Sequence, residues 1–272
     1  NNGTSDTATF VALGGDSEAN WSSYVNALND FQASGVIVFA SGNNPSEDSV
    51  GGYAGMPLVF EDLAEAWLTV GNLDVSGSTI NSSSVTRYSN PCGIAAEFCV
   101  YADGTDITST VGGYGGSSET GRYQIYDGSS MAAPMVSGSI ALLSQAFPNH
   151  TPAQLTDRIL ASANNDFFTA TGTTTFINGV THGYNAEFGH GIVDLSTALQ
   201  PIRTSSMIPP TAGFGASNTR YGNIETARRF ALSSSQVQLG AAFGDSIQNS
   251  LKGRKAYFYD ALNGGFAFDM GS

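Results

Sequence analysis

The first strong pattern in the chain is a helical repeat followed directly by an unbroken apolar run. Between residues 20 and 34, large hydrophobic side chains recur at steps of three and four: Trp21, Tyr24, Val25, Leu28 and Phe31. This spacing predicts an amphipathic helix, and Gly35 is a typical residue just past a helix end. Residues 36–40 (VIVFA) are all apolar, which is typical of a parallel strand buried on both faces. The two together predict half of a βαβ unit.

Alternation of strand-like and helix-like segments continues to about residue 200. Further strands are predicted at 67–73, 85–89, 97–102 and 122–126. Residues 131–147 are apolar on most faces, which predicts a buried helix. Another helix is predicted to start after Thr151, where Pro152 suits the first helical position and Gln154 completes a capping box. The fold class predicted from this order is α/β.

The C-terminal part of the chain has a different character. Residues 202–218 are rich in Ser, Thr, Pro and Gly, whereas 256–262 and 265–270 alternate apolar and polar positions. Asn263-Gly264 is a favoured two-residue turn, so these two segments predict a β-hairpin. We place a domain boundary near residue 205, with 1–205 as the first unit and 206–272 as a β-rich segment.

Charge and composition exclude several classes of protein. The formal net charge is −13, from 10 Lys and Arg against 23 Asp and Glu, which opposes nucleic-acid binding. No apolar run is long enough to span a membrane. Charged residues make up only 12% of a Gly-rich chain, a composition that favours an extracellular protein. The chain begins without a methionine or a signal-like segment, which indicates a mature fragment or an excerpt.

The only two cysteines, Cys92 and Cys99, are seven positions apart. Their spacing is not the C-x-x-C of zinc or redox sites, and no second Cys/His pair stands nearby. We predict a disulfide that closes a short loop, which would contribute about 2–3 kcal/mol in the chain-entropy model. Such a bridge implies an oxidising compartment. The alternative is a pair of free, buried thiols.

Candidate chemistry is concentrated in residues 128–134, Gly-Ser-Ser-Met-Ala-Ala-Pro. A serine at the start of a buried helix benefits from free backbone N–H groups and from the positive end of the helix dipole, which stabilise a developing anion. Small residues let a substrate approach, and Pro134 is expected in the first helical turn, where its missing N–H costs little. Ser130 is the candidate nucleophile, and Ser129 is the alternative candidate for a plain capping hydroxyl.

This stretch closely resembles the nucleophile motif of the subtilisin family, Gly-Thr-Ser-Met-Ala-x-Pro, with Ser129 in place of Thr. The resemblance implies that Ser130 is the nucleophile. Residues 36–44 (VIVFASGNN) resemble the family's strand that ends in Ala-x-Gly-Asn, which implies that Asn43 donates its side-chain amide to the oxyanion hole, together with the N–H of Ser130. A turn residue after a strand is the alternative for Asn43.

The same resemblance extends over most of the chain. It implies a subtilisin-like three-layer fold with a mostly parallel sheet, of which this chain is the C-terminal portion. Candidate substrate-binding residues are those beside the two motifs: Ser41, Gly42, Gly128 and Ser129. Residues 188–199 resemble the family's closing segment and final helix, which makes His190 structural. Asn1-Asn2-Gly3, or less clearly residues 12–15, resemble the start of a substrate-lining strand.

A narrower resemblance points to one branch of the family. Residues 89–99 (SNPCGIAAEFC) are similar to the secreted autotransporter subtilases of Gram-negative bacteria, and residues 242–270 resemble their junction before the outer-membrane barrel. This implies a location outside the cell or on the outer-membrane surface of a Gram-negative bacterium.

Two members of the expected catalytic triad are missing from this chain. A subtilisin triad runs Asp, His, Ser along the sequence, but no histidine precedes Asn43. All three histidines follow Ser130, and solvent or local hydrogen bonds are expected to explain His150 and His182. Three acidic residues before Asn43 lack the family's Asp-[Ser/Thr]-Gly context: Asp6, Asp16 and Asp30. We therefore expect the catalytic Asp and His on an N-terminal part of the same protease.

The resulting prediction is a secreted serine endopeptidase that acts on polypeptides through an acyl-enzyme. No cofactor or metal is expected at the site; calcium is common in the family, but no dense Asp/Glu loop places a calcium site here. One alternative is an inactive surface passenger that uses the same scaffold as a binding module. An esterase on another fold is disfavoured because the chain contains no G-x-S-x-G motif.

Overall fold

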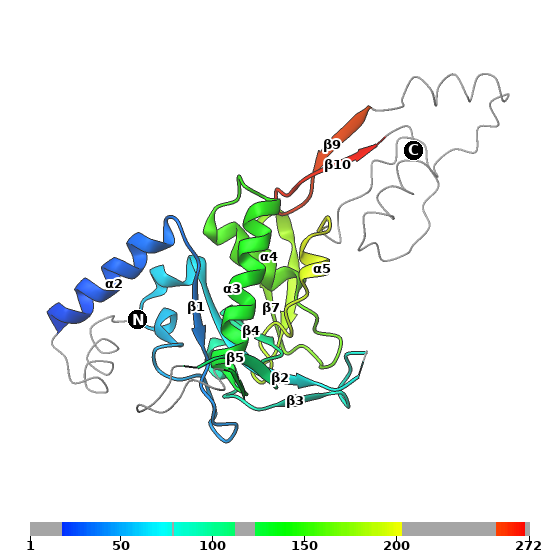
Figure 1. The fold of residues 1–272 in the computed structure, drawn as a ribbon. Helices are drawn as coiled ribbons and strands as arrows, with labels where there is room; N and C mark the ends of the chain where they lie inside the picture. Colours follow the sequence, from blue (N-terminus) through cyan, green and yellow to red (C-terminus); the bar gives the residue numbers. More distant parts are fainter. Residues whose placement is uncertain (1–17, 78, 112–122, 203–253, 270–272) are drawn as a thin grey trace, which may run out of the picture.

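The computed structural model describes residues 18–77, 79–111, 123–202 and 254–269 (Figure 1). The candidate strand segments at residues 1–3 and 12–15 lie outside the described residues, as do residues 203–253 and with them the boundary predicted near residue 205. None of the described helices combines the length and the apolar character needed to cross a membrane.

A small mixed sheet forms the centre of the fold. Strand β2 (Trp67–Val75) pairs in parallel with β1 (Ile37–Ala40) on one side and β4 (Cys99–Ala102) on the other, and its far end pairs antiparallel with β3 (Val85–Arg87). β2 is buried along its first seven residues. The α/β class predicted from the sequence is therefore confirmed.

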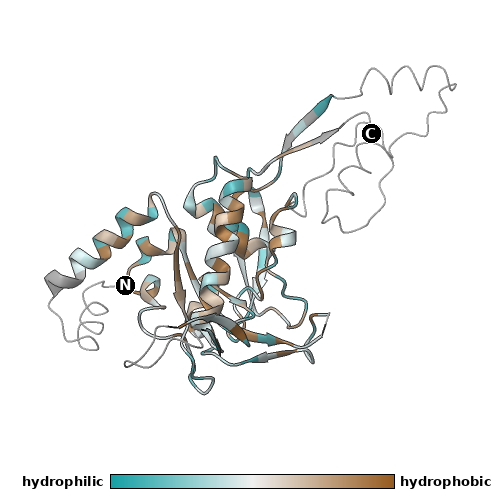
Figure 2. Cartoon of the chain, viewed as in Figure 1, coloured by the Kyte–Doolittle hydropathy of each residue, from teal (hydrophilic) through white to brown (hydrophobic). Residues whose placement is uncertain are grey.

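The side chains on the two faces of this sheet belong to two separate hydrophobic clusters. On one face, Leu68, Val70 and Val100 pack against helices α3 (Ser129–Ala146) and α4 (Pro152–Ser162). On the other face, Trp67 and Ile37 pack with Val25 of α2 (Glu18–Gln32) and with two 3₁₀ turns, η1 (Met56–Leu58) and η2 (Glu61–Ala66). Because successive side chains of a strand point to opposite faces, both faces of the sheet are covered. The fold therefore has three layers, with the sheet in the middle. Figure 2 shows the hydrophobic colouring concentrated along the sheet and α3.

Two sequence predictions of complete burial are wrong. In β1 only Ile37 is buried and the other three residues are half-exposed, because β1 lies at the edge of the described sheet and pairs there with β2 alone. Helix α3 is also exposed on one side, where Met135 and Leu142 are 46% and 51% exposed. The exposed side of α3 therefore carries apolar side chains that no other described element covers.

Several boundaries of helices and strands depend on residues close to them in the sequence. The capping box at the start of α4 is present, since the Thr151 side chain accepts from Gln154 N and the Gln154 side chain accepts from Thr151 N. The predicted strand at 97–102 begins only at Cys99, because 93–98 form a 3₁₀ turn. The other elements are β5 (Ile107–Thr110), β6 (Tyr123–Tyr126), β7 (Gly172–Thr175), η4 (Ile177–Gly179), β8 (Thr181–Tyr184) and α5 (Leu195–Ala198).

The C-terminal hairpin is present, but its turn differs from the prediction. β9 (Lys255–Tyr259) pairs antiparallel with β10 (Gly265–Asp269), and five residues, 260–264, connect them instead of the two at Asn263-Gly264. Ala261 and Leu262 leave the ladder because they are buried in the core beneath α3 and α4. The hairpin is thus docked on the body through its turn.

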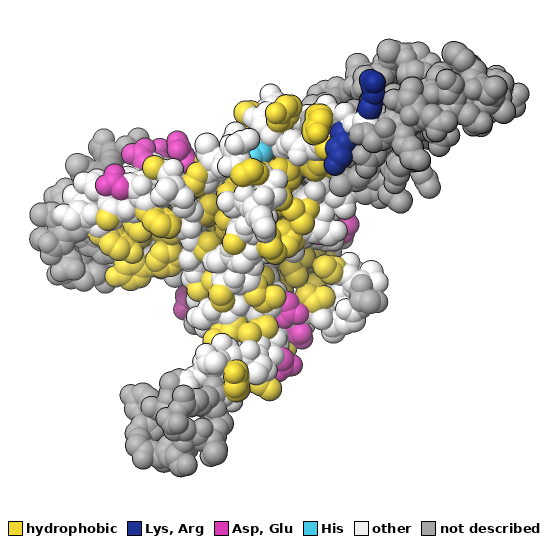
Figure 3. Space-filling model, turned by 45° about the horizontal axis from the view of Figure 1, so that its top comes forward, with side chains coloured by type: hydrophobic (Ala, Val, Ile, Leu, Met, Phe, Trp, Pro, Cys, Tyr) yellow, Lys and Arg dark blue, Asp and Glu magenta, His cyan; other side chains and the backbone are white. Residues whose placement is uncertain are grey.

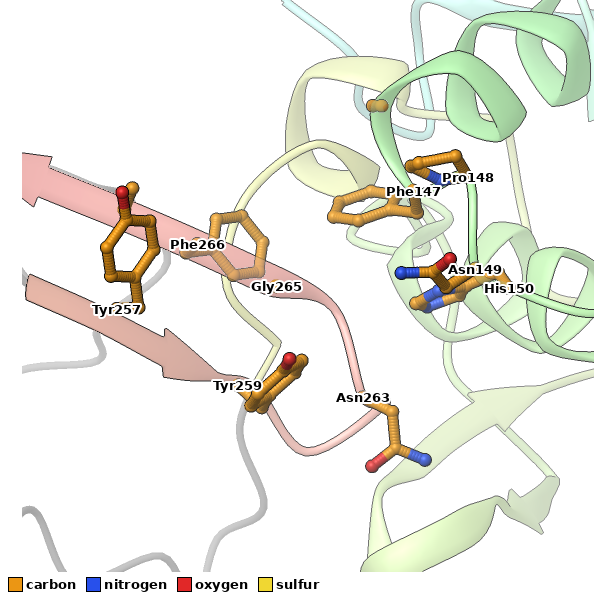
Figure 4. Close-up of a pocket in the computed structure, with 11 residues that line it drawn as sticks. Phe147, Pro148, Asn149, His150, Tyr257, Tyr259, Asn263, Gly265 and Phe266 are labelled. Atoms are coloured by element: carbon orange, nitrogen blue, oxygen red, sulfur yellow. The ribbon is translucent and has the colours of Figure 1, made fainter.

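A buried ion pair fixes this turn. Arg158 of α4 and Asp260 are both fully buried, with Nη2 2.7 Å from Oδ2. Arg158 also donates to the carbonyls of Ala198 and Gln200 and lies over the ring of Phe147, and Asp260 accepts from three backbone N–H groups, those of Ile202, Leu262 and Gly264. A cavity of about 310 Å³ lies beside this contact, between the end of α3 and the hairpin (Figure 4).

Removal of one ion-pair partner is expected to destabilise the protein strongly. Asp260→Ala leaves the Arg158 charge buried without a counter-charge, which costs about 3–5 kcal/mol of unfolding free energy. Chemical denaturation measures the change. Asp166→Ala, at an exposed aspartate, is the matched control and is expected to change stability by less than about 0.5 kcal/mol. Equal effects of the two variants would contradict the role of the pair.

Candidate active site

The site lies where the loop after β1 meets the first residues of α3. Gly42 and Asn43 are the second and third residues after β1, and Ser129 and Ser130 are the first two residues of α3. The sheet brings these segments together because α3 packs across both β1 and β2. The two sequence motifs, 87 positions apart at Gly42 and Ser129, are therefore in direct contact.

The Asn43 side chain is bound to the helix start through its oxygen. Its Oδ1 accepts from the backbone N–H of Ser129 at 2.8 Å and from the Ser129 hydroxyl, also at 2.8 Å. Both donors therefore meet the same amide oxygen, which fixes the orientation of the amide group. Among the described residues, the Nδ2 group of Asn43 has no hydrogen-bond acceptor and stays available as a donor. Asn43 is exposed, so this donor is accessible to a ligand.

Ser130 is also exposed, next to the residue that Asn43 binds. The N–H groups of Met131 and Ala132 both donate to the carbonyl of Gly128. In the described part of the chain, the N–H of Ser130 has no acceptor, as is usual for an amide in a first helical turn. The helix start thus presents one hydroxyl and one unpaired N–H at the surface, beside a side-chain amide.

Gly128 permits the close approach of these two segments. Its φ of +142° is disfavoured for residues with a side chain, and a Cβ at this position would lie 3.0 Å from both polar atoms of the Asn43 amide. Any other residue at position 128 would strain the helix entry and displace Asn43.

The other candidate substrate-binding residues are placed differently. Ser41 and Ser129 are 0% and 1% exposed. The Ser41 hydroxyl lies 3.4 Å from the carbonyls of Gly42 and Asn90, and the Ser129 hydroxyl binds the 42–43 loop rather than capping its own helix. Their side chains are buried under the loop and do not form an open surface. Contact of the Gly42 and Gly128 backbone with substrate stays a prediction.

The sequence predicts Pro134 in the first helical turn, and this prediction is wrong. Helix α3 starts at Ser129, two residues earlier than predicted, so Pro134 is its sixth residue. A proline there cannot donate to the carbonyl of Ser130, four residues before it. The backbone next to the candidate nucleophile thus lacks one helical hydrogen bond.

All three histidines are bound elsewhere. His150 Nε2 lies 3.1 Å from the carbonyl of Leu262, at the opposite end of α3, about 27 Å from its start for an 18-residue helix. His182 and His190 stack with their Nδ1 atoms 3.0 Å apart, and His182 Nε2 lies 2.9 Å from the carbonyl of Ala163. Burial, followed by the charge of His182, lowers the pKa of His190 to about 3. His182 thus lies on strand β8 in a buried pair, not in a solvated loop.

The predicted Cys92–Cys99 disulfide is present. It closes the 3₁₀ turn η3 (Gly93–Phe98) at the start of β4, and both cysteines are completely buried. Within the described ranges, no group of three or more His, Cys, Asp or Glu side chains is arranged to bind a metal ion.

The glycine at the helix entry yields a direct test of this geometry. Gly128→Ala is expected to destabilise the protein by about 1–3 kcal/mol, because it forces an unfavourable φ and a collision with Asn43. Gly138→Ala, in the middle of the same helix with nothing within 4 Å of the new methyl group, is expected to stabilise by about 1 kcal/mol. Chemical denaturation measures both. Stabilisation by both variants would show that position 128 is not constrained.

Comparison with known proteins identifies related sequences. Residues 10–191 match the model of the subtilase family, Peptidase S8. Fervidolysin of Fervidobacterium pennivorans is 33% identical over 181 residues, which cover 62% of this chain and 22% of fervidolysin. The extracellular serine protease of Serratia marcescens is 34% identical over 143 residues, which cover 47% of this chain and 13% of that protein. Subtilisin NAT of Bacillus subtilis subsp. natto is 30% identical over 168 residues, covering 62% and 35%.

Solved structures give partial superpositions. The crystal structure of fervidolysin aligns with a TM-score of 0.42 at 30% identity, over 61% of this chain and 23% of that one. The PatG macrocyclase in complex with peptide aligns with a TM-score of 0.41 at 22% identity, over 64% and 46%. The chain spans about a fifth of the length of fervidolysin. The family model matches well over half of the chain, from residue 10 to residue 191, and the chain belongs to the subtilase family of serine proteases.

Proposed function

We propose that this chain carries the nucleophile and the oxyanion hole of a secreted serine endopeptidase. Membership of the subtilase family supports the reaction class. The observation that carries the residue assignment is the pair of hydrogen bonds from Ser129 to Asn43 Oδ1, which leave Asn43 Nδ2 as a free donor on a residue next to the exposed Ser130. Two donors, Asn43 Nδ2 and the N–H of Ser130, are then available to one developing negative charge.

The proposed reaction uses these groups in sequence. The Ser130 hydroxyl attacks the carbonyl carbon of a peptide bond while a histidine takes its proton, and the carbonyl oxygen becomes an oxyanion. Asn43 Nδ2 and the Ser130 N–H donate to that oxygen, and the start of α3 adds the positive end of its dipole. The tetrahedral intermediate expels the amine, which receives the proton, and leaves an acyl group on Ser130. Water then hydrolyses the ester.

The proton acceptor and its aspartate are proposed to lie on an N-terminal part of the same protease. The three histidines of this chain are bound elsewhere, as described above. Helix α3 carries no charged residue in its 18 positions and still exposes Met135 and Leu142. Figure 3 shows hydrophobic side chains spread over the middle of one face of the molecule. Exposed apolar surface of this kind is typical of an interface, and the proposed partner covers it.

We further propose secretion and a polypeptide substrate. The disulfide fits an oxidising compartment, and a relative from Serratia marcescens is named an extracellular protease. The autotransporter branch of Gram-negative bacteria, with a location outside the cell or on the outer-membrane surface, rests on the resemblance of residues 89–99 and 242–270. A catalytically inactive binding module is the second candidate; the accessible Ser130 and the oriented Asn43 amide favour the enzyme.

Fluorophosphonate labelling of the complete protease distinguishes the two candidates. The probe is expected to modify Ser130, because its hydroxyl is exposed at the helix start. Ser130→Ala is expected to abolish both labelling and peptide hydrolysis. The control Ser137→Ala removes another exposed serine of the same helix and is expected to change neither. An unlabelled, inactive complete protein would favour the binding module.

The contribution of the oxyanion hole is measured by Asn43→Ala in the complete protease. The loss of one donor is expected to lower kcat by about 10²–10³-fold, a magnitude known from subtilisin itself, with little change in KM. Steady-state kinetics on a peptide substrate give both constants. A change confined to KM would place Asn43 in substrate binding instead.

The 272-residue chain alone is expected to be inactive. It lacks a histidine in reach of Ser130, so casein hydrolysis should not exceed background. Addition of the N-terminal part, by coexpression, is expected to restore activity. Robust hydrolysis by the chain alone would show that one of its own residues is the general base.

A further inference from the structure

We infer that Asn90 is a positioning residue for the oxyanion hole, because it binds the backbone on both sides of Asn43. The inference rests on the proposed function of Asn43. Asn90 belongs to neither of the two motifs that identify the site, and it lies 47 positions after Asn43 in the sequence.

The contacts of Asn90 bracket Asn43. Its backbone N–H donates to the carbonyl of Gly42 at 3.0 Å. Its side-chain Oδ1 accepts from the N–H of Asn44 at 2.8 Å. The residues immediately before and after Asn43 are thus attached to one rigid unit, which leaves the peptide of Asn43 little freedom to rotate.

The other half of the Asn90 amide closes the loop that follows. Its Nδ2 donates to the carbonyl of Ser49 at 2.8 Å. One amide group therefore joins the start of the loop at Asn44 to its end at Ser49, and both of its polar atoms are satisfied although Asn90 is only 6% exposed. A buried amide with complete partners is a strong local constraint.

The fit of Asn90 to Gly42 is close. Gly42 has a φ of +110°, and a Cβ at this position would lie 2.6 Å from Asn90 Oδ1. The glycine thus permits the Asn90 amide to reach Asn44. The Gly42 carbonyl also lies 3.2 Å from the Ser129 hydroxyl, so the same short loop contacts Asn90 on one side and the start of α3 on the other.

Asn90 is itself firmly supported. Its carbonyl lies 3.0 Å from the Tyr101 hydroxyl, which shares its one proton between this carbonyl and that of Glu187 at 2.9 Å. Burial raises the pKa of Tyr101, which keeps the hydroxyl protonated as a donor. Pro91 restricts the backbone of Asn90 to extended conformations, and the Cys92–Cys99 disulfide begins one residue later. Asn90 therefore connects the 42–44 loop to strand β4 and to the disulfide.

Ser129 and Asn90 have different roles in holding Asn43. Ser129 orients the side-chain amide, and Asn90 fixes the backbone from which that side chain extends. A displacement of about 1 Å at a reacting centre costs up to 10²-fold in rate. Loss of the Asn90 amide should therefore lower kcat through Asn43, without any contact between Asn90 and substrate.

A double-mutant cycle in the complete protease tests this mechanism. Asn90→Ala is expected to lower kcat by about 10–100-fold with KM nearly unchanged. Asn90→Asp keeps the acceptor for Asn44 N–H and is expected to lose less. In an Asn43→Ala background, both Asn90 variants should have little further effect on kcat, because the donor that they position is already absent. Active-site titration with the fluorophosphonate corrects each rate for folded enzyme.

The matched control is Asn165→Ala, which removes another side-chain bond to a backbone carbonyl, at Gly183; in the described residues Asn165 has no hydrogen bond to the 42–44 loop. It is expected to leave kcat unchanged in both backgrounds. The inference is overturned if Asn90→Ala leaves kcat intact, or if its loss is the same with and without Asn43. Activity that survives Ser130→Ala would instead overturn the proposed function, and the inference with it. If Asn90→Ala does not fold, the cycle with Asn90→Asp decides.

Discussion

The contact between the Asn43 amide and the first residue of α3 is the interaction on which the site depends. A helix start leaves backbone N–H groups without acceptors. In α3 one of them, at Ser129, is satisfied by a side chain from a distant loop rather than by a cap of its own. Together with the bond from the Ser129 hydroxyl, this bond aligns the asparagine amide and holds the loop after β1 against the helix. The next N–H, that of Ser130, has no acceptor in the described part of the chain. The position of the loop after β1 and the proposed oxyanion donors thus depend on the same contact.

The sheet makes that contact possible. Parallel strands β1, β2 and β4 end on the same side, and α3 packs across them, so the loop after β1 reaches the N-terminus of α3. The constraint continues through Asn90, whose segment lies between β3 and β4. Three segments that are separate in the sequence therefore converge at the ends of neighbouring strands, as is usual for binding sites in open α/β sheets.

Two features concern what packs against the described body: its exposed apolar surface and the C-terminal hairpin attached to it. Helix α3 and strand β1 expose apolar surface, which fits the proposal of a further layer from an N-terminal part. The C-terminal hairpin, by contrast, is attached to the described body by a buried ion pair and by Ala261 and Leu262 in the core. Residues 254–269 therefore share the core of residues 18–202, although the subtilase match ends at residue 191.

Local signals in the sequence determined much of this protein: the order of the main helices and strands, the capping box at Thr151, the disulfide, and Ser130 and Asn43 as candidate residues. Each of these depends on neighbours within a few positions or on a short motif. Strands β5, β7 and β8 escaped prediction because they are short and rich in Ser, Thr and Gly, without apolar alternation. Only the tertiary structure decided which partners meet across long separations. Asn44 binds Asn90 across 46 positions and Arg158 binds Asp260 across 102. No period or spacing encodes such pairs, since they follow from how the layers pack.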